Sequence, residues 1–79
     1  MFINKATDGS HNLCGRNIHI LRKNLGISQR ELADRLQISG LDVDKNAIQR
    51  IEAGKRFVTD IELSLLAAVF KRPINELVM

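Results

Sequence analysis

Four polar side chains that can form hydrogen bonds with base edges lie close together in the middle of the chain. They are two cations and two amides: Lys45, Asn46, Gln49 and Arg50. On a helix, with about 100° between successive residues, these four spread over one arc, and Ala47, Ile48 and Ile51 spread over the opposite one. Arginine and lysine pair with guanine, and amides pair with adenine, in a DNA major groove wide enough to admit an α-helix. The pattern predicts a helix that is buried on one face and bonds to bases with the other.

We call this predicted helix the reading helix, because its polar face is expected to bond to bases. Residues at both of its ends mark where it begins and ends. Asp44 precedes it and is a favoured N-cap residue, because its carboxylate can accept from the free backbone amides of the first turn. Ala53 ends it, and Gly54 can take the left-handed conformation that often follows a helix. These residues predict a helix over residues 44–53.

Another amphipathic helix is predicted just before it. Ser28 and Glu31 have the spacing of a capping box, in which side chain and backbone exchange hydrogen bonds at a helix N-terminus. The residues that follow place Leu32, Ala33 and Leu36 on one apolar face. Ala33 is small enough to let another helix come close.

A connection of about six residues, 38–43, joins the two helices. Helix-turn-helix units usually have a turn of three or four residues, so this one is extended. Its apolar residues Leu41 and Val43 alternate with acidic ones, which predicts an extended run that places two apolar side chains in the core.

The flanking segments predict the elements that hold this pair. Residues 1–12 have no sustained periodicity and are predicted to be a flexible arm; residues 13–79 form the domain. A first helix is predicted over residues 13–25, stopped by Gly26. Its predicted inward face carries Ile18, Leu21 and Leu25.

The C-terminal part predicts two more helices. Thr59 and Glu62 repeat the capping-box spacing. The helix that follows is predicted to face the core with Leu63, Leu66, Ala67 and Phe70. Pro73 fits the first position of a short fifth helix, which ends in Leu77, Val78 and Met79, either tucked into the core or paired with another copy.

An ordered set of short motifs between residues 18 and 77, about three quarters of the chain, matches a known family. The motifs are Arg22, then LGISQ at 25–29, ELA at 31–33, IQRIEAG at 48–54, Leu66-Ala67 and INEL at 74–77. Together they resemble the helix-turn-helix domain of phage Cro and repressor proteins and of the bacterial XRE regulators. The resemblance implies an all-α fold, a compact five-helix domain of the lambda-repressor type.

The resemblance also implies roles for single residues. Lys45, Asn46 and Arg50 match family positions that often touch bases, and Gln49 lies between them on the same arc. The phosphate contacts that it implies are Gln29, Lys55 and Arg56, although the last two also suit an ordinary solvated loop. Arg22 and Glu52 match a family ion pair, and we assign them to the scaffold rather than to DNA contact.

Composition limits the other classes of function. With 79 residues there is room for one domain, and the net charge is +3. Residues 15–56 carry nine basic against five acidic side chains, whereas residues 57–79 carry two against three, so the positive excess lies around the predicted reading helix. A basic balance also suits acidic protein partners or a membrane surface. The single cysteine, Cys14, excludes an intrachain disulfide and favours a reducing cytoplasm, and no apolar run is long enough to span a bilayer.

Neither an enzyme nor a metal site is expected. His11, Cys14 and His19 are too few and too widely spaced for tetrahedral zinc. No nucleophile has a histidine and an acid at useful spacing, and no glycine-rich phosphate loop is present. No cofactor is predicted.

The leading hypothesis is a regulator of transcription that binds an operator on double-stranded DNA as a homodimer, with half-sites about one helical turn apart. Repression is the default, because nothing beyond the five helices is available to contact polymerase. The alternative is an antitoxin or a protein-interaction adaptor built on the same fold. A pure adaptor would more plausibly show an apolar patch where this chain has its polar quartet, but an antitoxin that also represses its own operon is compatible with it.

Overall fold

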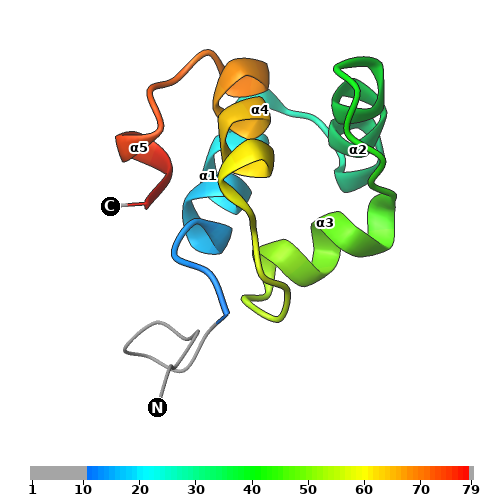
Figure 1. The fold of residues 1–79 in the computed structure, drawn as a ribbon. Helices are drawn as coiled ribbons and strands as arrows, with labels where there is room; N and C mark the ends of the chain where they lie inside the picture. The colour runs from blue at the N-terminus through cyan, green and yellow to red at the C-terminus, as the bar shows by residue number, and fades with distance from the viewer. Residues whose placement is uncertain (1–10, 79) are drawn as a thin grey trace.

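The computed structural model describes residues 11–78, and this part of the chain is all helical (Figure 1). The helices are α1 (Gly15–Leu25), α2 (Gln29–Ile38), α3 (Lys45–Glu52), α4 (Asp60–Phe70) and α5 (Asn75–Val78). The predicted all-α class with five helices is confirmed. Residues 1–10 of the predicted arm, and Met79, lie outside the described residues.

The helix ends follow local signals in the sequence. Asp44 caps α3 by accepting from the backbone amide of Ala47 at 2.8 Å, and Thr59 with Glu62 forms a complete capping box on α4. Ser28 accepts from the backbone amide of Glu31, but the Glu31 carboxylate pairs with an arginine one turn further along α2. Only half of the predicted capping box therefore forms at α2.

Three predicted details of the flanking helices are wrong. Helix α1 begins at Gly15 rather than at residue 13, and Leu25 at its end is 49% exposed rather than inward. Gly26 turns the chain with a φ of 71°, and Ile27, the next residue, has its side chain buried in the core. Pro73 is not the first residue of α5 but precedes it by two residues, and its carbonyl accepts from the amide of Glu76 at 3.0 Å in a turn that leads into the helix.

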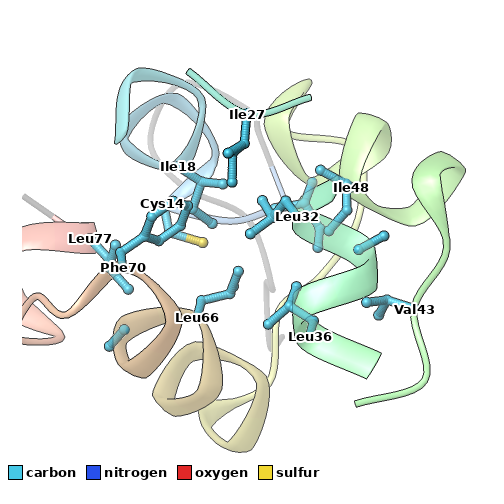
Figure 2. Packing of buried hydrophobic residues seen from close by; sticks show 13 residues of the cluster. Cys14, Ile18, Ile27, Leu32, Leu36, Val43, Ile48, Leu66, Phe70 and Leu77 are labelled. Carbon is cyan, nitrogen blue, oxygen red and sulfur yellow. The ribbon is translucent and has the colours of Figure 1, made fainter. Parts of the chain in front are cut away.

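One apolar core joins the helices (Figure 2). Its fully buried aliphatic side chains are Ile18, Leu32, Leu36, Ile48, Ile51, Leu66 and Leu77. Phe70 is buried with them, as predicted, and Leu77 of α5 is tucked into the core. Because every helix contributes at least one of these side chains, the position of α3 is set by the whole core.

The extended connection between α2 and α3 is ordered by its own contacts. Val43 is buried and Leu41 is partly buried against the core, as the alternation predicted. The Gln37 side chain donates to the backbone carbonyl of Val43 at 2.6 Å, and the amide of Leu41 bonds to the carbonyl of Leu36 at 2.9 Å. Across residues 11–78, every helix is too short or too polar to pass through a bilayer.

Candidate nucleic-acid interface

Helix α3 separates apolar from polar side chains in the way its sequence predicted. Ile48 and Ile51 are buried, and Ala47 is partly buried. The four predicted base-reading residues are all exposed: Lys45, Asn46, Gln49 and Arg50. The core thus fixes the back of this helix, and its hydrogen-bonding groups are free to meet a ligand.

A buried ion pair ties α1 to the last residue of α3. Arg22 Nε lies 2.6 Å from Glu52 Oε2, and the two side chains are only 7% and 5% exposed. A second nitrogen of the guanidinium donates to the carbonyl of Ile27 at 2.9 Å. Ion pairs removed from water need such additional bonds to offset the cost of desolvation. The pair therefore joins α1 to the C-terminal end of α3, away from solvent.

The Glu52 carboxylate also accepts two bonds that were not predicted from the sequence. His19 Nδ1 lies 2.9 Å from Oε1, and Gln29 Nε2 donates to the same oxygen at 3.2 Å. Burial alone would raise the pKa of Glu52, but the hydrogen bonds from Arg22, His19 and Gln29 outweigh it and hold this pKa below its ordinary value. The spacing of His19 and Arg22, three residues apart on one helix, is a signal that could have placed both at one acid.

Gln29, the first residue of α2, thus lies between the scaffold and the surface. Its side chain is half-buried and bonded to Glu52, so its role as a phosphate contact stays a prediction. Beside it is an open hollow of about 660 Å³, lined by the end of α1 and the beginnings of α2 and α3. The exposed cations on its wall are Lys23, Arg30 and Lys45, whereas Arg22, which also lines it, is buried and paired with Glu52. Such a wall suits an anionic polymer backbone.

The two predicted phosphate clamps after α3 differ in their surroundings. Lys55 is exposed. Arg56 is half-buried, and its guanidinium grips the Glu62 carboxylate with two bonds of 3.1 and 2.8 Å. The hydrogen bond from Arg56 is the main reason that the pKa of Glu62 is lowered. A phosphate would have to compete for Arg56 with this carboxylate, which was not predicted from the sequence as its partner.

His11, Cys14 and His19 each have different partners in the structure. The ring of His11 meets the ring of Phe57 edge-on, with 4.6 Å between the ring centroids. Cys14 is buried in the core, and this burial raises the pKa of its thiol to about 11. His19 bonds to Glu52. Within residues 11–78 no three potential metal ligands come together.

Comparisons with known proteins agree with this geometry. The profile of a helix-turn-helix family matches residues 18–77, and no curated protein sequence matches the chain. Among solved structures, the restriction-modification controller protein C.AhdI from Aeromonas hydrophila is 27% identical, with a TM-score of 0.69 over 80% of this chain and 84% of that one. The DNA-binding domain of BldD is 24% identical, with a TM-score of 0.70 over 86% of this chain and 92% of its own, and it shows likeness of fold alone. The chain therefore belongs to the helix-turn-helix family of the Cro and XRE type.

Proposed function

We propose that this protein is a sequence-specific regulator of transcription that binds double-stranded DNA, with α3 in the major groove. The observation that carries the proposal is the exposed quartet of Lys45, Asn46, Gln49 and Arg50 on a helix whose other face is locked into the core. Membership of the family and the likeness to a controller protein support it. Bound to an operator, the protein would act as a repressor by excluding other proteins from that site.

The proposed readers differ in the bases they suit. Asn46, in the first turn of α3, has the donor and acceptor needed for a bidentate pair with adenine, and Arg50 has the parallel donors that match guanine. Lys45 and Gln49 adjoin them on the same face. Phosphate contacts are proposed for Gln29 and Lys55, and for Arg56 once it releases Glu62. Contacts of this second kind give affinity without sequence information.

Selection of bound duplexes from a random-sequence pool, at two salt concentrations, tests this function. A consensus with two-fold symmetry is expected, because a dimer presents two copies of α3 to two half-sites. The salt dependence of binding to the selected duplex reports the number of phosphates contacted. A pool that never enriches any sequence would show that α3 does not read bases.

Replacing Asn46 by alanine is expected to cost about 1–3 kcal/mol of binding free energy on the selected duplex and to relax the preference at one base pair. The matched variant is Lys55→Ala, which should weaken binding to all sequences alike and flatten the salt dependence by about one unit. Both residues are exposed, so neither change should disturb the fold. Equal losses for Asn46→Ala on selected and random DNA would remove Asn46 from the set of base readers.

We propose that the dimer forms through the exposed face of α4. Ile61 is 69% exposed and, with Leu65, Asp60 and Ser64, borders a shallow hollow on this helix. The opposite face of α4 packs Leu66 and Phe70 into the core. A helix that is apolar on both sides is normally covered on both sides, and the second copy of the chain is the proposed cover.

Ile61→Lys tests this interface. The change is expected to make the protein monomeric by sedimentation, because two lysines would face each other across a two-fold axis. Binding to a duplex with both half-sites should fall, whereas binding to a single half-site should persist. Exposed Ile38 on α2, 87% accessible, supplies the control, since Ile38→Lys lies on another helix and should leave the assembly intact. An Ile61→Lys protein that is still dimeric would place the interface elsewhere.

A further inference from the structure

The side chain of Asn12 connects three separate segments of the fold. Its Nδ2 donates to the carbonyl of Ile51 at 3.1 Å and to the carbonyl of Arg56 at 2.8 Å. Its Oδ1 accepts from the amide of Gly15 at 2.7 Å. One amide group thus joins the beginning of α1, the last turn of α3 and the loop that follows α3. The Ile51 carbonyl also accepts from the amide of Gly54 at 3.0 Å in the turn that ends α3, so Asn12 adds a second bond to this oxygen and ties it to the segment before α1.

The loop after α3 is held from the same side by His11. The His11 backbone amide donates to the carbonyl of Gly54 at 2.8 Å, and its ring lies against Phe57. Figure 1 shows the chain entering α1 beside this loop. On the far side of the loop, Arg56 is anchored to Glu62 on α4. The segment that carries Lys55 is therefore clamped between the residues before α1 and the beginning of α4.

We propose that Asn12 is a positioning residue for DNA reading, which fixes the C-terminal end of α3 and the Lys55 loop in the orientation that binding needs. The inference rests on the proposed function of α3. Asn12 lies before the first helix, outside the helix-turn-helix unit, and acts through the backbone of α3 rather than by touching DNA. Its bonds fix the part of α3 that carries Gln49 and Arg50.

The physical effect of the clamp is preorganisation. A reading helix that is free to tilt has to be ordered when it binds, and this ordering costs binding free energy. Base contacts require a fixed geometry, whereas contacts with random DNA tolerate several. Loss of the clamp should therefore reduce discrimination between sequences more than it reduces affinity for DNA in general.

The experiment compares variants of the full chain on two duplexes: the one selected from the random pool by the wild-type protein, and a scrambled duplex of equal length and composition. Asn12→Ala is expected to lower the ratio of the two affinities by about tenfold. Asn17→Ala is the matched control, because the Asn17 side chain donates to the carbonyl of Leu77 in α5 at 2.8 Å, away from α3. It should change stability but leave the ratio unchanged.

A second variant keeps the test decisive if Asn12→Ala does not fold. Phe57 is half-exposed, so Phe57→Ala removes the contact with His11 at small cost to folding and should lower the ratio in the same direction by a smaller factor. Folded Asn12→Ala and Phe57→Ala proteins that keep the wild-type ratio would overturn the positioning role, as would an equal drop for Asn17→Ala. A wild-type protein that prefers no duplex would instead overturn the proposed function itself.

Discussion

Replacing Arg22 by alanine is expected to lower the free energy of unfolding by about 3–5 kcal/mol, measured by urea titration. The change leaves the carboxylate of Glu52 without its cationic partner, and the side chain of Glu52 is only 5% exposed. Without Arg22 the carboxylate is buried beside His19 and Gln29 alone, and the carbonyl of Ile27 loses its donor. Removing one partner of a buried pair costs far more than the pair itself contributes, because the other charge stays out of water.

The pair between Arg35 and Glu31 provides the control. It has the same chemistry, but its side chains are 45% and 51% exposed. Arg35→Ala should therefore cost less than about 0.5 kcal/mol, as exposed pairs one helical turn apart usually do. A loss for Arg22→Ala below about 1 kcal/mol would mean that Glu52 finds water or another partner.

The stability that Arg22→Ala loses is expected to depend on pH, and this dependence follows from the pKa of Glu52. In the wild-type protein this pKa is held below its ordinary value, so the stabilisation is present above the unfolded pKa of about 4.3 and is lost as the pH falls through the folded value. Without Arg22, burial raises the pKa of Glu52, and the carboxyl takes up a proton in the folded state at a higher pH. The difference in stability between the two proteins should therefore shrink as the pH is lowered from 7 towards 4.

Features set by neighbouring residues could be predicted from the sequence. Asp44 and Thr59 cap their helices because each bonds to an amide three residues ahead, and Gly26 ends α1 because it tolerates a positive φ. The buried face of α3 follows from helical periodicity alone. These interactions need no knowledge of the tertiary fold. The five helices and the buried face of α3 could therefore be predicted from the sequence.

Contacts between residues far apart in the chain could not be predicted in the same way. Asn12 lies in a polar stretch that predicted a flexible arm, yet its partners are Ile51 and Arg56, about forty residues later. His11 and Asn12, the last two residues of that stretch, thus bond to the end of α3 and to the loop that follows it. The partners of a side chain that bonds to backbone carbonyls cannot be recognised from their residue types, because every residue has a carbonyl.

The polar residues around α3 show the same limit. Periodicity placed the quartet of α3 on the surface, but it could not say that Gln29 bonds to Glu52 or that Arg56 bonds to Glu62. A cation or an amide near a predicted DNA surface has the same chemistry whether it faces phosphate or a carboxylate of its own chain. Only the tertiary fold, which brings Gln29 to Glu52 and Arg56 to Glu62, decides between these partners.

Replacing Gly15 by alanine is expected to lower the free energy of unfolding by about 3 kcal/mol, because α1 and α3 meet backbone to backbone at this residue. A Cβ atom at Gly15 would overlap the carbonyl oxygen of Ile51 and lie 2.9 Å from Oδ1 of Asn12. Neither group can move freely, since Ile51 is part of α3 and Asn12 is bonded on three sides. Overpacking of this kind typically costs about 1–3 kcal/mol, and occasionally more.

Whether Gly15→Ala lowers or raises the free energy of unfolding is decisive, because helix propensity alone predicts that it raises it. Alanine is a better helix former than glycine by about 1 kcal/mol, so an α1 that stood clear of α3 would be stabilised by the substitution. The comparison variant is Gly26→Ala, where a Cβ meets nothing within 4 Å and only the φ of 71° opposes it, at a cost of about 1 kcal/mol. A Gly15→Ala protein as stable as the wild type in thermal unfolding would mean that α3 shifts to make room. The same protein should then discriminate poorly between duplexes, because the end of its reading helix would have moved away from Asn12.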